Sequence, residues 1–270
     1  MITITPIKSL DHQDLKPYRT LRQSVEQFRQ GKFIGEGKIV VNRLLESDHE
    51  IISVLITQEL LEKYREFLAA RPEQINVFVG NKELLNTIVG YNLHQNIMVL
   101  GKIPAQDTLN SVLTKSSKPY LFVALDGLTN AENLGVLVRN CTAFGVQAIL
   151  VGETSSSPYL RRAVRNSMGT VFKMPVVYCT KLVDTLKMLQ SSYKFKIFAA
   201  HPHTEEHSIQ RADFSGNCCL VFGSEGDGIS PQVLSVCDMP VAIPMQSGVD
   251  SLNVASASAV FLYEALRQRS

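Results

Sequence analysis

The pattern of apolar and polar positions divides the first hundred residues into alternating strand-like and helix-like stretches. Short apolar runs predict strands at Ile51–Ile56, Ile75–Val79 and Ile97–Leu100. Between them, apolar residues at three- and four-residue steps predict helices at Gln58–Ala70 and Lys82–Val89. Strands that alternate with helices imply a partly parallel sheet.

The first 35 residues follow a helical pattern instead. Their apolar residues recur at three- and four-residue steps and predict an amphipathic helical lead: Leu15, Tyr18, Leu21, Val25 and Phe28. The glycine-rich stretch Gly31–Gly37 then opens the small α/β region.

A second α/β region follows a stretch rich in Pro, Asn and Ser. Its predicted strands alternate with helices and lie at Leu121–Leu125, Ala148–Val151, Phe195–Ala200, Cys218–Gly223 and Met239–Ile243. A final helix is expected from near Leu252 to near Gln268. The predicted organisation is therefore an N-terminal lead and α/β domain over 1–101, a linker over 102–118 and a larger α/β domain over 119–270.

Composition indicates where the protein acts in the cell, but the distribution of charge does not decide whether it binds nucleic acid. No run of eighteen apolar residues occurs, the N-terminus lacks a signal-peptide layout, and the five cysteines have no C-x-x-C spacing. We therefore expect a cytoplasmic protein. The net charge of +2 does not by itself predict a nucleic-acid binder, but residues 1–43 carry eight Lys and Arg against four Asp and Glu. A second basic cluster, Arg161, Arg162 and Arg165, fits phosphate contact and a solvated helix face equally well.

Two apolar–glycine–turn units near the C-terminus carry the strongest functional signal. Leu220–Gly228 and Val241–Ala255 each predict a short buried strand that ends in a turn and leads into a helix. Turns at the carboxyl ends of parallel strands are where open α/β sheets bind ligands. Glu225 and Asn253 are isolated polar residues in otherwise small or apolar turns, which is typical of a cofactor pocket with a few placed polar groups.

A third unit lies earlier in the chain. The strand-and-turn stretch Phe122–Gly127 precedes a helix that we expect Asn133 to cap and Gly145 to end. Arg139 is the only cation between Asp126 and Gly152. In so apolar a helix, an arginine either extends to the surface or binds an anion.

The residues of these three units resemble the motifs of the SpoU family, the TrmH-like RNA ribose 2′-O-methyltransferases of the SPOUT group. The first motif, N-L-G-x-x-x-R, matches Asn133 through Arg139, and the second, G-x-E-x-x-G, matches Gly223 through Gly228. The third, I-P-M followed by S-L-N-V, matches Ile243–Met245 and Ser251–Val254. One departure, Gly127 where many relatives have proline, affects the turn before the first motif.

The resemblance implies a fold, cofactor and partners. It implies a SPOUT α/β domain with a deep trefoil knot, which ordinary topology rules would not have suggested. Phe33–Gly37 and His94–Gln95 resemble the small α/β, L30e-like substrate-binding domain found in front of many SpoU catalytic domains. The family is dimeric with its active site near the subunit interface. Four apolar residues of the final helix fit either that interface or the core: Val260, Phe261, Tyr263 and Leu266.

The implied reaction is methyl transfer from S-adenosylmethionine to a ribose 2′-hydroxyl. The resemblance assigns catalytic positions to Arg139, Asn133, Glu225, Ser251 and Asn253, and cofactor contact to the backbone around Gly223, Ile243 and Leu252. Arg139 is expected to clamp a phosphate and stabilise oxyanion charge, since arginine stays protonated. Glu225 is expected to orient Arg139 or Asn133, while Ser251 and Asn253 position the ribose and the third motif's turn.

The substrate and some alternatives stay open. Large-subunit (23S) ribosomal RNA is the preferred substrate because of the resemblance of the front domain, and transfer RNA is the alternative. RNA contact is assigned to Arg161, Arg162 and Arg165. A catalytically silent RNA-binding protein and another nucleotide-binding enzyme are further alternatives, the latter disfavoured because dinucleotide and phosphate-loop motifs are missing. No metal site is expected, since Pro202 interrupts the histidine-rich stretch 201–207 and H-E-x-x-H is absent.

Overall fold

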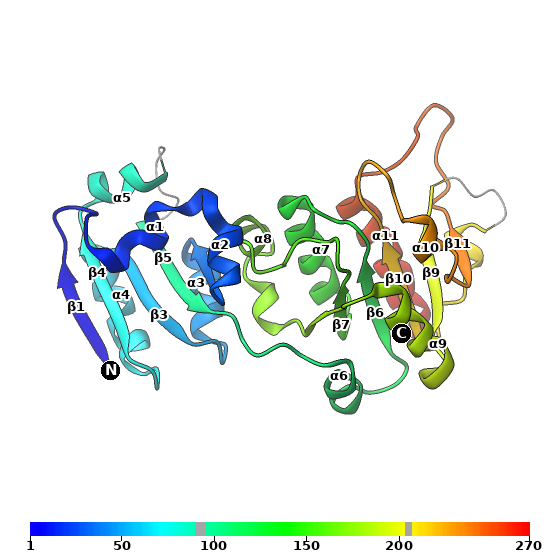
Figure 1. The fold of residues 1–270 in the computed structure, drawn as a ribbon, viewed down its shortest axis with the longest axis horizontal. Coiled ribbons are helices and arrows are strands. Elements are labelled where there is room, and N and C mark those ends of the chain that lie inside the picture. The colour runs from blue at the N-terminus through cyan, green and yellow to red at the C-terminus, as the bar shows by residue number, and fades with distance from the viewer. Residues whose placement is uncertain (90–95, 203–206) are drawn as a thin grey trace. The chain divides into compact units, whose positions relative to one another are not determined.

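The computed structural model describes residues 1–89, 96–202 and 207–270 and divides into two compact units (Figure 1). The first unit comprises residues 1–105 and 159–172, and the second comprises 106–158 and 173–270. Residues 159–172, expected in the second α/β domain, belong to the first unit, and the residues of the expected linker 102–118 divide between the two units after residue 105. His94–Gln95, part of the front-domain resemblance, lies outside the described residues.

The first unit contains a five-stranded mixed sheet in the order β1-β4-β3-β5-β2. Its strands are β1 (Ile2–Pro6), β2 (Lys32–Glu36), β3 (Ile51–Thr57), β4 (Ile75–Gly80) and β5 (Ile97–Lys102). β1, β4 and β3 run parallel, whereas β5 pairs antiparallel with both β3 and β2. This arrangement confirms the partly parallel sheet expected from the alternation of strands and helices.

The prediction of a helical lead was wrong for the first residues of the chain. Ile2–Pro6 is a strand that pairs with β4, because its isoleucines and threonines are β-branched and favour extended backbone. The rest of the lead forms short helices rather than one: η1 (Gln13–Leu15), α1 (Lys16–Arg19), η2 (Leu21–Gln23) and α2 (Ser24–Arg29). Leu15, Tyr18 and Leu21 are buried as the pattern requires, but Val25 is exposed.

The remaining helices of the first unit are α3 (Lys38–Leu45), α4 (Gln58–Ala69), α5 (Lys82–Val89) and α8 (Arg161–Asn166). The segment that carries α8, residues 159–172, is held by an aromatic cluster. Rings of Tyr159 and Phe172 lie 5.7 and 5.3 Å from the ring of Phe33, and His49 Nε2 lies 3.1 Å from the Tyr159 hydroxyl.

The second unit contains a six-stranded, entirely parallel sheet in the order β11-β9-β10-β6-β7-β8. Its strands are β6 (Leu121–Leu125), β7 (Ala148–Val151), β8 (Val176–Tyr178), β9 (Lys196–Ala200), β10 (Cys218–Phe222) and β11 (Met239–Val241). Five of the six match the predicted strands, and only the three-residue β8 was missed. The helices are α6 (Leu109–Lys115), α7 (Ala131–Ala143), α9 (Leu182–Tyr193), η5 (Ile209–Arg211), α10 (Pro231–Leu234) and α11 (Val254–Arg269). A further 3₁₀ helix, η4 (Thr170–Lys173), spans the boundary between the two units' residue ranges.

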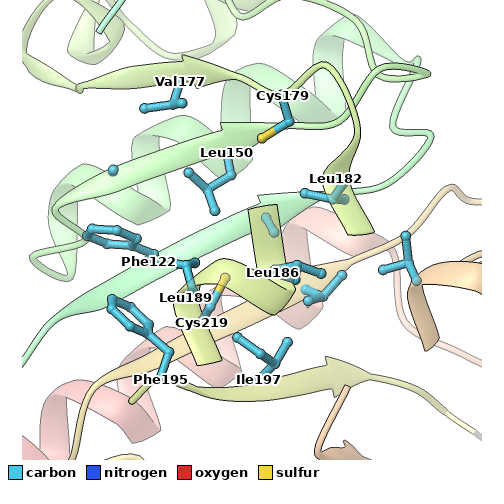
Figure 2. Packing of buried hydrophobic residues seen from close by; sticks show 14 of the residues in the cluster. Phe122, Leu150, Val177, Cys179, Leu182, Leu186, Leu189, Phe195, Ile197 and Cys219 are labelled. Carbon is cyan, nitrogen blue, oxygen red and sulfur yellow. The ribbon is translucent and has the colours of Figure 1, made fainter. Parts of the chain in front are cut away.

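Both faces of this sheet are buried, which explains why its strands are continuous apolar runs. Figure 2 shows one face, where Phe122 and Cys219 pack with Leu186 and Leu189 of α9. On the other face, the Phe222 ring lies 5.8 Å from the ring of Phe261 in α11. None of the helices in the described part of the chain combines the length and the apolar character of a membrane span.

Candidate active site

A cavity of about 450 Å³ lies at the carboxyl ends of β9, β10 and β11. Its lining comes from the residues that follow each of these strands and from the start of α11. β9 separates β10 from β11 in the sheet, yet both predicted turns reach this cavity. The expectation of a ligand site at this edge of the sheet agrees with the cavity's position.

The first turn depends on a glycine for its own closure. Ser224 and Gly228 exchange two backbone hydrogen bonds of 2.9 and 3.2 Å. A side chain at Gly223 would overlap the backbone of Gly228 and Ile229, whereas one at Gly226 would meet nothing within 4 Å. Gly223 is therefore required by the turn itself, and the turn presents its backbone to the cavity.

One residue from each of the three motifs joins a chain of hydrogen bonds. Asn133 Nδ2 donates to Glu225 Oε1 at 2.6 Å, and Asn253 Nδ2 donates to Asn133 Oδ1 at 3.1 Å. Asn253 Oδ1 in turn accepts from the backbone N–H of Ala255 at 2.9 Å and so caps α11. The chain fixes the turn after β10, the start of α7 and the start of α11 to one another.

The expected helix cap at Asn133 was wrong by three residues. Asn130 caps α7, because its side-chain oxygen accepts from the backbone N–H groups of Glu132 and Asn133 at 2.9 and 3.1 Å. The Asn133 side chain is consequently available to bond Glu225. The asparagine three residues earlier was the missed signal, since Asn is a favoured cap just before a helix.

Arg139 lies apart from this chain of hydrogen bonds. It is exposed on α7, does not line the cavity, and has no hydrogen bond or ion pair with any described residue. Of the two partners expected for Glu225, the structure places Asn133 in contact. Ser251 is exposed on the cavity wall.

The three positions expected to contact a cofactor, Gly223, Ile243 and Leu252, all line the cavity. Met245 and Phe261 also line it, although the sequence did not mark them as site residues. A few hundred cubic ångströms lined by apolar side chains, backbone and a few polar groups suits a small organic ligand. Among the described residues, no group of three or more His, Cys, Asp or Glu is placed to bind a metal.

The arginines of α8 lie in the first unit and differ from one another. Arg161 Nη1 donates to Glu36 Oε2 at 2.7 Å, and the two side chains are only 12% and 1% exposed. Arg165 lies 3.8 Å from the other oxygen of Glu36 and is 41% exposed. Arg162 is exposed on the same helix. Arg161 is therefore held in a buried ion pair, while its two neighbours face solvent.

Comparison with known proteins identifies the family. The model of the SpoU rRNA Methylase family matches residues 120–263, more than half of the chain. The chain therefore belongs to this family, and the resemblance drawn from its three motifs is confirmed.

Relatives extend the match to most of the chain. The 23S rRNA (guanosine-2′-O-)-methyltransferase RlmB of Acinetobacter baylyi is 32% identical over 238 residues, which are 85% of this chain and 94% of that protein. RlmB of Vibrio vulnificus is 36% identical over 65% of this chain and 71% of that protein.

Solved structures share the fold. The SpoU methyltransferase AviRb from Streptomyces viridochromogenes superposes with a TM-score of 0.81 at 24% identity, covering 94% of this chain and 96% of that one. An AdoMet-bound rRNA methyltransferase from Sinorhizobium meliloti gives a TM-score of 0.82 at 23% identity and covers 98% of both chains.

Proposed function

We propose that this protein transfers a methyl group from S-adenosylmethionine to the ribose 2′-hydroxyl of a guanosine in 23S ribosomal RNA. The observation that carries the proposal is the chain of hydrogen bonds Glu225–Asn133–Asn253 at the edge of the cavity. It joins the three family motifs into one site. The RlmB relatives, named as 23S rRNA guanosine 2′-O-methyltransferases, support the choice of substrate.

S-adenosylmethionine is the cofactor that the cavity fits. Backbone groups around Gly223, Ile243 and Leu252 would hold it, with the apolar side chains of Ile243 and Leu252 against its adenine. AdoMet-bound structures of AviRb and of the S. meliloti enzyme support this assignment. Because the cofactor brings a methyl group already activated on a sulfonium, the protein's main task is to align the acceptor oxygen.

The proposed roles of the site residues follow from their positions. Asn133 holds Glu225 and Asn253 in register, and Asn253 fixes the start of α11. Ser251, exposed on the cavity wall, contacts the substrate ribose. Arg139 stays protonated, so it clamps a phosphate and stabilises the developing oxyanion rather than removing a proton. Its exposure on α7 leaves it accessible to RNA.

The proposed protein is a homodimer. α7 and α11 pack together, and Asn140 of α7 donates to Ala255 O and Ser258 Oγ of α11 at 2.8 and 3.0 Å. Large apolar side chains on these two helices stay exposed: Val136, Val260, Tyr263 and Leu266. A second copy of the chain would cover them. Phe261, by contrast, is buried in the core.

Three finer features complete the proposal. The second unit contains the deep trefoil knot of the SPOUT group, and the first unit is an L30e-like domain that binds the RNA substrate. The exposed Arg162 and the partly exposed Arg165 contact the RNA backbone, whereas the buried Arg161 shares Glu36 with Arg165 and supports it. We expect the enzyme to act in the cytoplasm.

A tritiated methyl-transfer assay tests the proposal. Ribosomal and transfer RNA from cells that lack this enzyme would be incubated with labelled S-adenosylmethionine and either wild-type protein or Arg139→Ala. Alkali-resistant label at one guanosine of 23S rRNA, lost with Arg139→Ala, is the expected result. Label in transfer RNA would instead assign transfer RNA as the substrate. Cofactor binding without any transfer to naked RNA or ribosomal subunits would leave a silent RNA-binding protein.

A further inference from the structure

A second cavity, of about 410 Å³, lies entirely within the first unit. The short helices of the lead form one side of it, and residues of strands β2 to β5 form the other: Lys32, Ile52, Ser53, Asn76 and Leu100. None of the residues assigned to methyl transfer lines it. We call it the lead cavity.

A buried amide in the lead cavity has an unused hydrogen-bond acceptor. Gln27 lines the cavity and is only 5% exposed. Its Nε2 donates to Pro17 O at 2.7 Å and to Thr20 O at 3.4 Å, while its Oε1 has no partner among the described residues. A buried acceptor without a partner is unfavourable, so a ligand that donates a hydrogen bond there would bind favourably.

The opposite wall offers a second unused amide. Asn76 of β4 lines the cavity, is partly buried, and its side chain has no hydrogen bond with any described residue. Beside it, the pairing of β3 with β5 shifts register between Ile51 and Ser53. Such bulges redirect side chains and are frequent next to binding sites. Two side-chain amides from different elements, Gln27 and Asn76, therefore line one cavity with donors or acceptors that no described residue uses.

The charges around the cavity argue against a phosphate site. Lys16 and Lys32 are matched by Asp14 and Glu26 among the lining residues. Pro17, Ile52 and Leu100 add apolar surface. A neutral ligand with apolar faces and a polar edge suits this combination.

We infer that the lead cavity binds one unpaired RNA base that carries an exocyclic amino group, an inference that rests on the proposed RNA substrate. Such a base has apolar faces, and its amino group donates to Gln27 Oε1 while Asn76 bonds the rest of its edge. Sequence-selective proteins commonly read RNA through unstacked bases recognised on these edges. The cavity thus selects the substrate at a nucleotide other than the methylated one.

Cytosine and uracil pentanucleotides provide the most direct test, because only cytosine carries an exocyclic amino group at this edge: it has that donor and a ring-nitrogen acceptor where uracil has a carbonyl and a ring N–H. Fluorescence anisotropy with the full-length protein is expected to give about tenfold tighter binding of the cytosine pentamer, the equivalent of one hydrogen bond. Gln27→Met, which removes the acceptor for the amino group, is expected to abolish this preference. Asn76→Val, which removes no hydrogen bond of the folded protein, is expected to weaken the binding of both pentamers. Gln58→Met, an exposed change at the start of α4 in the same unit, preserves the preference. Equal binding of the two pentamers by the wild type, an unchanged preference in Gln27→Met, or unchanged affinities in Asn76→Val, overturns the inference.

Methyl transfer separates this inference from the proposed function. With a 23S rRNA fragment as substrate, Asn76→Val is expected to raise KM about tenfold and leave kcat unchanged. Gln27→Met should act in the same direction, with its unfolding midpoint measured in parallel because it also loses two internal hydrogen bonds. If the wild type transfers no methyl group, the proposed function fails while the pentamer preference still decides the base site. If transfer occurs and Asn76→Val keeps the wild-type KM, the base site fails alone.

Discussion

Asn133 contacts both of the other motifs, so its removal is expected to disorganise the active site without unfolding the protein. Asn133→Ala leaves Glu225 and Asn253 without their shared partner, but both are exposed and water can replace the lost bonds. We expect unfolding free energy to change by less than about 1 kcal/mol. The methyl-transfer rate should fall about a hundredfold, since small displacements of catalytic groups have effects of that size.

Single-turnover methyl transfer and urea unfolding check this prediction together. Asn130→Ala serves as the control, because it removes the cap of α7 but not the Asn133 side chain. It should cost about 1 kcal/mol of stability and affect the rate far less. An Asn133→Ala enzyme that works at the wild-type rate would show that the chain of hydrogen bonds has no catalytic role.

Gly223 and Gly226 share one turn but differ in what surrounds them. A methyl group at Gly223 meets the backbone of Gly228 and Ile229, which cannot move without opening the turn, whereas Gly226 faces open space. Gly223→Ala is therefore expected to lower the unfolding free energy by about 2–3 kcal/mol, as overpacking does. Gly226→Ala should stay within about 0.5 kcal/mol of wild type. Urea unfolding of the two variants measures this difference, and equal stabilities would contradict the assigned role of Gly223.

His49 makes the stability of the first unit depend on pH. Its burial lowers the pKa of the imidazole below 6.5, an effect that the nearby Asp48 only partly opposes. The unfolded chain takes up a proton near pH 6.5 while the folded chain resists it. This contribution is complete above pH 6.5 and is lost as the pH falls toward the lower, folded pKa.

Urea unfolding at pH 7.5 and 5.5 measures this dependence. The wild type is expected to lose more stability over that interval than His49→Gln, which cannot take up the proton. Since the Tyr159 hydroxyl contacts His49 Nε2, the His49→Gln variant is expected to start from a lower stability, and only the two pH differences are compared. An identical loss in both proteins would exclude His49 as the titrating group.

At the scale of elements, the sequence predicted interior strands better than edge strands, since the missed strands β1, β2 and β8 each lie at an edge of a sheet. Apart from the short β8, the strands of the parallel sheet form apolar runs buried on both faces, and their predicted bounds agree with the observed ones within a few residues. β1 was missed because its alternating Ile and Thr residues preceded a helical pattern and were grouped with it. The lead was broken into short helices partly by Pro17, which lacks the N–H needed inside a helix.

The candidate site was predictable only where short motifs carried it. Asn133, Glu225 and Asn253 were identified from three motifs, and one of the two partners proposed for Glu225 is in contact. The bonded residues are 92 and 120 positions apart in the sequence and are brought together only by the fold. The sequence pattern therefore could not predict which of them bond to each other. The same limit hid the pairing of Arg161 with Glu36, which turned an expected RNA contact into a buried ion pair.

The ion pair with Glu36 gives Arg161 a structural role, whereas the adjacent and exposed Arg162 is proposed to contact RNA. Arg161→Met leaves the Glu36 carboxylate buried with only the more distant Arg165 nearby, and is expected to destabilise the protein by about 3 kcal/mol. Arg162→Met changes an exposed residue, so stability should stay within about 0.5 kcal/mol. RNA affinity in low salt should instead weaken, with a smaller salt dependence. Thermal unfolding and filter binding measure the two effects, and a reversal of the pattern would contradict the assignment.

At the scale of the whole molecule, the proposed dimer makes the mass in solution a direct observable. Exposed Val260, Tyr263 and Leu266 lie on α11, which packs against α7, and the Tyr263 ring also contacts Phe144 at 6.4 Å. Apolar side chains gathered on adjoining helices mark a surface that association would bury. Light scattering is expected to give twice the chain mass of 30.0 kDa.

Val260→Asp tests whether these helices form the interface, because a carboxylate there would have to be desolvated on association. The variant is expected to elute as a folded monomer. Its methyl-transfer rate should fall with it if the active site is completed near the interface. Met188→Asp is the matched control, since Met188 is 44% exposed on α9, in the same unit but on a helix outside the proposed interface. A wild-type monomer, or a Val260→Asp protein that stays dimeric, would remove α7 and α11 from the interface and leave their apolar side chains unexplained.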